Sequence, residues 1–126
     1  MHRLLTAALG LSVVLASCSG GPSTERRAET AAGLATLKAQ HELEGKTYEA
    51  VEGRSTCPGG DCSDEDAGFA YAQGHALETT DGCGTEYHTQ TFTDGCEAYA
   101  GIVAARADAA RQAVLQAEAS RQASAN

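Results

Sequence analysis

Four cysteines constrain the fold of this chain more than any other feature. Cys57, Cys62, Cys83 and Cys96 lie in a 126-residue sequence that has no Trp, two Phe and four Tyr. Because Ala supplies much of the apolar content, the chain can bury only a small core for its length. Small domains with thin cores commonly use disulfides when they fold in an oxidising compartment. The composition therefore predicts a small domain closed by two disulfides.

The spacing of these cysteines favours disulfides over a zinc site. Structural zinc sites usually show two close C-x2-4-C pairs, and only Cys57 and Cys62 approach that spacing. Four cysteines allow three pairings. Cys57 and Cys62 flank a Pro-Gly-Gly turn, and Cys83 lies in a loop that leads to Cys96. We therefore expect the pairs Cys57–Cys62 and Cys83–Cys96, although a bridge from Cys57 or Cys62 to Cys96 would also satisfy the sequence.

The fifth cysteine, Cys18, ends a segment with the order of an export signal. Arg3 is followed by an apolar run, Leu4–Leu15, that is too short to span a bilayer as a helix. Residues 15–18 read Leu-Ala-Ser-Cys, which resembles the lipobox of bacterial lipoproteins. We expect residues 1–17 to be a lipoprotein signal peptide and Cys18 to be lipidated. An ordinary secretory signal cut nearby is the alternative.

Lipidation of Cys18 would place the protein at the bacterial cell envelope. Several acyl chains make such anchoring effectively permanent. Residues 18–23 would then form a flexible tether. No Asp follows Cys18, which by resemblance to proteobacterial sorting rules favours the outer membrane over the cell membrane. We expect a membrane contact through the N-terminal lipid, a domain facing the periplasm or the exterior, and a protein partner in the same compartment.

Residue propensities predict a mainly α-helical domain with helices at about 24–44, 64–77 and 91–119, joined by irregular loops. Ser23 or Thr24 can cap the first helix. The other two helices open on a capping-box-like spacing, which begins at a hydroxyl side chain and ends at an acid three residues later. These two openings are Ser63–Asp66 and Thr91–Asp94. Between the first two helices, Lys46–Val51 is the only segment where a short strand is plausible.

We divide the exported part into three regions. Residues 24–44 form a helical stalk or a packing helix, because the apolar face of that helix is weak. Its members are Ala28, Ala31, Leu34, Ala35 and Leu37. Residues 45–103 form the disulfide-bonded helical module, and residues 104–126 are an Ala-rich helical extension. This extension projects, frays after about Ala119, or pairs with the first helix.

Part of the module resembles a group of small exported bacterial proteins. The shared pattern is a Cys, then Gly-aromatic-x-aromatic-Ala, then a Cys, then Ser/Thr-Phe-x-acid-Gly-Cys-x-Ala-Tyr. Here it reads Cys62, Gly68–Ala72, Cys83 and Thr91–Tyr99. This chain has Tyr71 where Trp is usual and acids at 64–66 where a Gly-His pair is common. The resemblance implies a disulfide-bonded two-helix module and implies no reaction.

Two glycines in predicted helices indicate a close helix crossing. Gly68 and Gly95 each cost a helix about 1 kcal/mol relative to Ala, which is easiest to justify where two backbones approach. We expect an aromatic core beside this crossing. Its members are Phe69, Tyr71, Phe92 and Tyr99.

The charge distribution excludes nucleic acid as a partner. The formal net charge is −8, and residues 41–97 hold thirteen acidic residues but only Lys46 and Arg54 as bases. Phosphate contacts need a basic patch. Three of the acids could offer oxygens to calcium, but they lack EF-hand spacing and are also explained as acids near a helix start. These weak metal candidates are Asp61, Asp64 and Asp66.

No pattern of catalytic residues stands out. The exported part has three histidines, His41, His75 and His88, and none lies in a zinc-protease motif or a helical His pair. The sequence also lacks a G-x-S-x-G turn and a phosphate-binding glycine loop. We expect a non-enzymatic structural or interaction protein without a cofactor. The alternative is a small acidic module that binds a cation or another ligand at the membrane surface.

Overall fold

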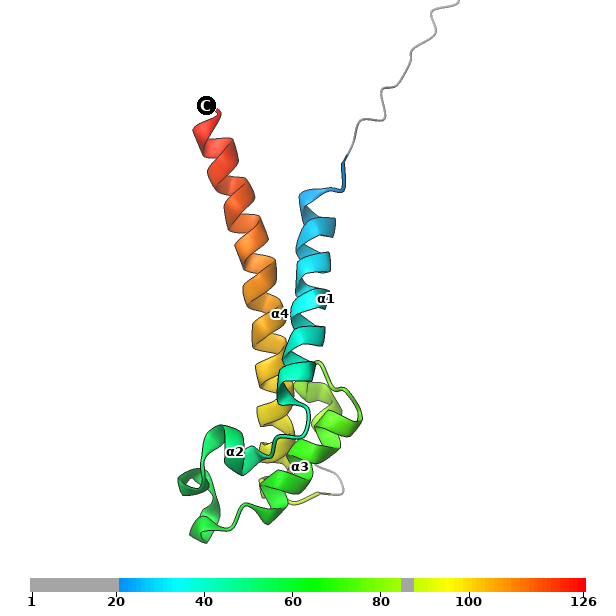
Figure 1. Cartoon of the computed structure of the whole chain (residues 1–126), viewed down its shortest axis with the longest axis vertical. Coiled ribbons are helices and arrows are strands. Elements are labelled where there is room, and N and C mark those ends of the chain that lie inside the picture. Colours follow the sequence, from blue (N-terminus) through cyan, green and yellow to red (C-terminus); the bar gives the residue numbers. More distant parts are fainter. Residues whose placement is uncertain (1–20, 85–87) are drawn as a thin grey trace, which may run out of the picture.

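The computed structural model describes residues 21–84 and 88–126, which form an all-helical fold (Figure 1). The elements of these ranges are α1 (Thr24–Leu43), α2 (Tyr48–Glu52), the 3-10 turns η1 (Arg54–Thr56) and η2 (Pro58–Gly60), α3 (Ser63–Gly74), the 3-10 turn η3 (Thr80–Cys83) and α4 (Gln90–Ser124). Neither range contains a strand. The predicted mainly α, disulfide-bonded fold class is confirmed. The expected signal peptide and Cys18 lie outside the described residues.

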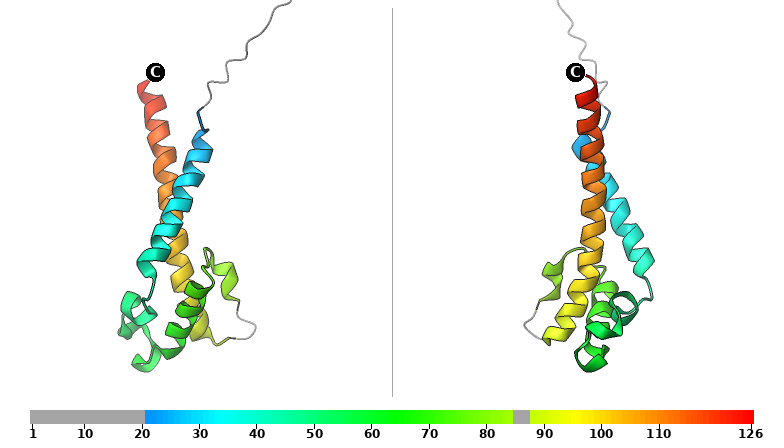
Figure 2. Two further views of the ribbon diagram at one scale, coloured as in Figure 1. Left: turned by 45° about the vertical axis from the view of Figure 1, so that its right-hand side comes forward. Right: turned by 90° about the vertical axis from the view of Figure 1, so that its left-hand side faces the viewer.

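Helices α1 and α4 pack together as a long pair, and the shorter elements gather at one end of it (Figures 1 and 2). The predicted face of α1 was wrong in part, because Leu34 and Leu37 are 65% and 64% exposed. Small side chains one helical turn apart face α4 instead, and they let the two backbones approach. The buried residues of α1 are Ala28, Ala32, Thr36, Ala39 and Leu43.

Helix α4 is continuous from Gln90 to Ser124, five residues beyond the predicted end. Its buried residues all lie in its first half, and the last of them is Val103. Beyond that point, Arg106, Arg111 and Glu118 of α4 form ion pairs with side chains of α1. No helix of the described ranges is both long enough and apolar enough to cross a membrane.

The close crossing predicted at Gly68 and Gly95 is confirmed. A Cβ atom added to Gly68 of α3 would lie 1.8 Å from the Phe92 carbonyl oxygen of α4. A Cβ atom added to Gly95 of α4 would lie 1.9 Å from the Glu65 carbonyl oxygen of α3. Because neither helix has room for a side chain at this point, the two glycines set the distance between α3 and α4.

The aromatic core is smaller than predicted. Phe69 and Tyr99 are almost fully buried and meet edge to face, with ring centroids 5.3 Å apart. Burial raises the pKa of the Tyr99 hydroxyl. Tyr71 and Phe92, in contrast, are only half-buried. The prediction was wrong for these two rings, which border the core on the outside.

The strand considered at Lys46–Val51 is wrong, because this segment holds the short helix α2. The Thr47 hydroxyl accepts a hydrogen bond from the Ala50 amide at 3.2 Å, which caps the helix start. Glu49 adds an acid in the first turn. The described ranges also offer no partner strand for pairing. Local capping therefore decides the structure here.

Both predicted capping boxes were also wrong in detail. Helix α3 begins at Ser63 without a side-chain cap, and the Asp61 carboxylate accepts from the Ser63 amide at 3.0 Å. Helix α4 is capped two residues earlier than predicted, because the Thr89 hydroxyl accepts from the Phe92 amide at 3.2 Å. In each case, the accepting oxygen belongs to a residue two positions before the predicted capping residue.

Helix α3 ends at Gly74, three residues before the predicted end at Leu77. Ala76 takes a left-handed conformation with φ of 48°. The Leu77 amide donates to the Ala72 carbonyl at 3.0 Å, and the Ala76 amide donates to Gln73 at 3.1 Å. This pair of bonds is a Schellman motif, which usually has glycine where Ala76 stands.

Candidate functional site

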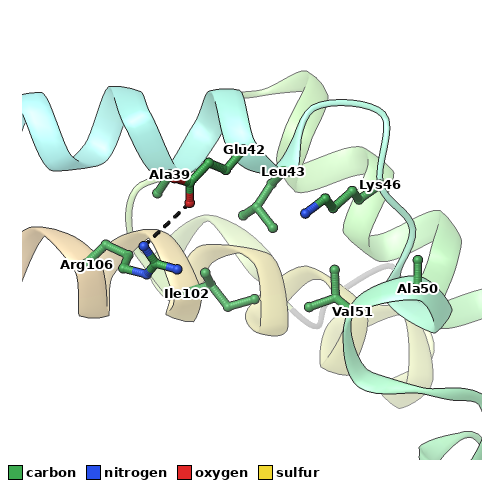
Figure 3. Close-up of a pocket in the computed structure, with 8 residues that line it drawn as sticks. All are labelled: Ala39, Glu42, Leu43, Lys46, Ala50, Val51, Ile102 and Arg106. Atoms are coloured by element: carbon green, nitrogen blue, oxygen red, sulfur yellow. Dashed lines mark ion pairs between the residues drawn. The ribbon is translucent and has the colours of Figure 1, made fainter.

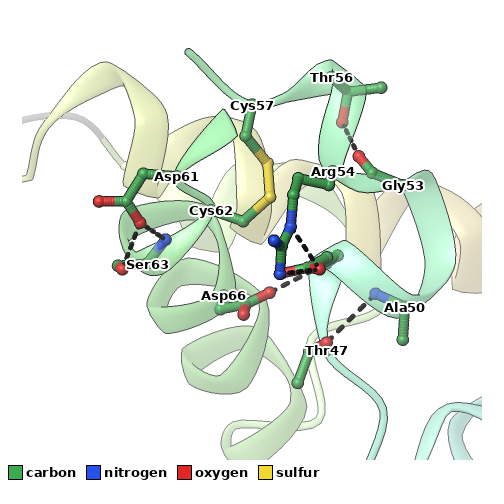
Figure 4. Close-up of polar contacts among 11 residues, drawn as sticks. Thr47, Ala50, Gly53, Arg54, Thr56, Cys57, Asp61, Cys62, Ser63 and Asp66 are labelled. Atoms are coloured by element: carbon green, nitrogen blue, oxygen red, sulfur yellow. Dashed lines mark hydrogen bonds and ion pairs between the residues drawn. A yellow bond between two sulfur atoms is a disulfide. The ribbon is translucent and has the colours of Figure 1, made fainter. Parts of the chain in front are cut away.

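The first disulfide closes a loop that holds α2 against α3 (Figure 4). Cys57 and Cys62 are bridged, as predicted, with their Cα atoms 5.1 Å apart. Beside them, the Asp66 carboxylate accepts from the Glu49 amide at 2.9 Å. The Glu49 carboxylate in turn pairs with the Arg54 guanidinium at 2.7 Å. The loop is therefore fixed both covalently and by hydrogen bonds.

The three predicted metal candidates serve separate hydrogen bonds. Asp61 accepts from Ser63, and this hydroxyl and amide lower the pKa of the Asp61 carboxyl. Asp64 accepts from the hydroxyls of Thr89 and Thr91, at 2.9 Å each. Asp66 accepts from the α2 backbone, as described above. Across residues 21–84 and 88–126, no three His, Cys, Asp or Glu side chains are grouped so as to hold a metal ion.

Glu65 is a buried acid within the acidic first turn of α3. It is 3% exposed, and its Oε2 atom has no hydrogen-bond partner in the described part of the chain. It borders a polar cavity of about 350 Å³ at the start of α3. Its backbone also makes the close contact with Gly95. This acid is therefore drawn inward by the helix crossing.

The second disulfide joins the 3-10 turn η3 to the first turns of α4. Cys83 and Cys96 are bridged, as predicted, with their Cα atoms 5.7 Å apart. Both are buried in the same core as Phe69 and Tyr99. This bridge therefore anchors the long loop before α4 to the core.

The three histidines do not gather into one site, although His75 and His88 both pack against the Tyr71 ring. His88 stacks on Phe92 with ring centroids 4.0 Å apart. The ring centroids of His75 and Tyr71 are 4.2 Å apart. The His75 ring also contacts the Tyr71 carbonyl oxygen at 2.8 Å. His41 lies on α1 and pairs with Glu44 at 3.4 Å. The first two histidines cover the half-buried aromatic rings, and His41 belongs to a different surface.

A cavity of about 550 Å³ lies where α1, α2 and α4 meet, and Figure 3 shows its lining. Its apolar walls come from Ala39, Leu43, Ala50, Val51 and Ile102, and its charged groups are Glu42, Lys46 and Arg106. No local sequence pattern indicates this site, because its residues come from α1, α2, α4 and the connection between α1 and α2. Their convergence depends on the α1–α4 packing and on α2 being a helix.

The chain matches no protein-family model, no curated protein and no solved structure.

Proposed function

We propose that this chain is a bacterial envelope lipoprotein, anchored through Cys18, that acts as a non-enzymatic structural or interaction protein. The observation that carries the proposal is the pair of disulfides in a small helical domain. Structural disulfides form and persist in oxidising compartments, outside the bacterial cytoplasm. The lipobox-like order of residues 15–18 supplies the anchor.

The arrangement of the helices suits an anchored protein. Helix α1 begins at Thr24, and the disulfide-bonded end of the domain lies at the opposite end of this helix (Figure 1). A helix of 20 residues is about 30 Å long. An anchor at Cys18 would therefore allow α1 to hold the disulfide-bonded end well away from the membrane.

The exposed leucines of α1 supply a surface for a protein partner. Leu34 and Leu37 are more than half exposed and lie one helical turn apart. They stand away from the buried residues that face α4. Apolar side chains grouped on a surface favour protein contacts. We infer that these leucines contact an envelope protein in the same compartment.

Fractionation of a bacterial host tests the anchor. We expect the wild-type protein in the membrane fraction, with an N-terminal peptide that begins at a triacylated Cys18. The variant Cys18→Ser should appear in the soluble fraction with both disulfides intact. A wild-type product that is soluble and unmodified at Cys18 would contradict the proposal.

Site-specific photo-crosslinking in intact envelopes tests the partner surface. A photoreactive residue at position 34 or 37 should give the same adduct with another envelope protein. The matched control is position 30, because Thr30 is an exposed residue of the same helix. Equal labelling at all three positions, or no adduct at 34 and 37, would contradict the assignment of this surface.

A further inference from the structure

The half-open cavity between α1, α2 and α4 has the volume of a small-molecule site and a mixed apolar and charged lining. Ligand sites in proteins span about 300 to 1,000 Å³ and are mostly apolar, with a few polar groups that orient the ligand. Here Leu43 of α1, Val51 of α2 and Ile102 of α4 supply the apolar surface, within a volume of about 550 Å³. These three helices are held in place by the packing of α1 on α4 and by the contact of α2 with α3.

Lys46 is the distinctive charge of this cavity. Between residues 41 and 97 the chain has two basic residues, and the other one, Arg54, pairs with Glu49 at 2.7 Å. The Lys46 ammonium makes no ion pair or hydrogen bond to any described residue. In Figure 3 it extends along the space beside Leu43. A cation without a partner among the described residues therefore lies next to an apolar wall, in the most acidic part of the chain.

The other two charged groups of the cavity, Arg106 and Glu42, form an ion pair with each other. Arg106 of α4 lies 3.5 Å from the Glu42 carboxylate of α1, at the end of the cavity opposite Lys46 (Figure 3). Lys38 approaches the same carboxylate from outside at 3.8 Å. The lining residues thus leave one net positive charge, at Lys46. A complementary ligand carries one negative charge and an apolar body.

We propose that this cavity binds a small aliphatic monocarboxylate. Its carboxylate accepts hydrogen bonds from the Lys46 ammonium, and its hydrocarbon part covers Leu43, Val51 and Ile102. The Arg106–Glu42 pair closes the far end and limits the length of the hydrocarbon part. This role goes beyond the proposed partner contact, since the cavity lies apart from Leu34 and Leu37.

NMR titration of the whole chain carrying Cys18→Ser, with both disulfides formed, tests the proposal without a competing acyl chain. Octanoate should shift the methyl signals of Leu43, Val51 and Ile102 saturably. Acetate has the same head group without the tail, and octylamine has the same tail with the opposite charge. Neither of them should saturate at the same concentrations. Saturation by octylamine as tight as by octanoate, or no saturation by octanoate, would overturn the proposal.

Two matched variants locate the carboxylate. Lys46→Gln should weaken octanoate about tenfold or more, because it removes the charge-assisted hydrogen bond. Lys38→Gln should leave the affinity unchanged, since Lys38 lies on α1 near the cavity but does not line it. Both side chains are exposed, so both variants should keep the fold. Equal weakening by the two variants would overturn the assignment of Lys46.

A carboxylate next to an apolar group can belong to a free small molecule or to the C-terminus of a protein. A short peptide with a C-terminal Leu distinguishes these two sources. The proposal expects octanoate to bind at least as tightly as the peptide, since the cavity has the size of a small-molecule site. Binding of the peptide in the absence of octanoate binding would overturn the proposal and assign the cavity to a protein terminus.

Discussion

The two halves of α4 are stabilised in different ways. The first half crosses α3 at Gly68 and Gly95, carries a disulfide at Cys96 and buries Tyr99 and Val103. The second half has no buried residue, and its contacts to α1 include exposed ion pairs and small side chains. Large buried side chains and covalent links dominate at one end, and buried alanines of α1, surface charges and helix propensity dominate at the other.

The difference shows how a chain with little apolar material can form an ordered helical pair. Surface ion pairs contribute about 0 to 1 kcal/mol each. A disulfide contributes about 2 to 4 kcal/mol, and close packing of buried groups contributes a similar amount. We therefore expect the free energy of unfolding to be concentrated at the disulfide end, and the following changes should separate the two halves.

The largest effect is expected from Gly95→Ala. The added methyl group would overlap the Glu65 backbone, so α3 and α4 must move apart. Such overpacking against backbone should lower the free energy of unfolding by about 3 kcal/mol. The control is Gly101→Ala on the same helix, where the added methyl group meets nothing within 4 Å. That variant should gain up to about 1 kcal/mol from helix propensity. Urea unfolding of both variants checks the difference, and equal effects would contradict the close crossing.

Removal of the two disulfides should have unequal effects. The Cys83–Cys96 bridge spans 13 residues and Cys57–Cys62 spans 5, so the first restricts the unfolded chain more. The double variant Cys83→Ala, Cys96→Ala should lose about 3 kcal/mol, and Cys57→Ala, Cys62→Ala about 2 kcal/mol. Thermal unfolding of the two variants checks this order. The reverse order would show that the loop beside α2 matters more than the core bridge.

A smaller gain is expected from Ala76→Gly at the end of α3. Ala76 has φ of 48°, a conformation in which glycine is unstrained. Relief of this strain should raise the free energy of unfolding by about 0.5 to 1 kcal/mol. The control is Ala70→Gly in the exposed middle of α3, which should destabilise by about 1 kcal/mol. Loss of stability in both variants would contradict the Schellman geometry.

The smallest effect is expected at the far end, from Glu29→Gln. Hydrogen bonds from Arg111, and then its charge, lower the pKa of the Glu29 carboxyl below 4.5. A lowered folded-state pKa means that the stabilisation is present above about pH 4.5 and is lost as the pH falls through the folded value. The variant should therefore melt slightly below the wild type at pH 7 and equally at pH 2.

The control for this prediction is Glu97→Gln, because Glu97 is exposed and has no ion pair to a described residue. It should leave the melting temperature unchanged at both values of pH. Salt at 1 M should reduce the effect of Glu29→Gln at pH 7 by screening. A deficit of Glu29→Gln that persists at pH 2 would show that the effect does not come from the charge.

Local signals in the sequence predicted the fold class, both disulfide pairs and the glycine crossing. Each of these depends on neighbouring residues or on one strong steric requirement. The cavity could not be predicted, since Lys46 and Arg106 come to line the same space only through tertiary packing. The exposure of Leu34 and Leu37 was missed for a similar reason. A helix of small residues has no dominant apolar face, so the position of α4 decides which side is buried.

Hydrogen exchange along α4 tests the contrast between the two halves most directly, because both halves belong to one continuous helix. We expect amides near 96–103 to exchange only through global unfolding and to become faster with Gly95→Ala. Amides at 112–122 should exchange much faster in the wild type, through local opening. Uniform slow exchange from residue 96 to 122 would contradict the account, since it would mean that the far half of α4 is as stable as the disulfide-bonded half.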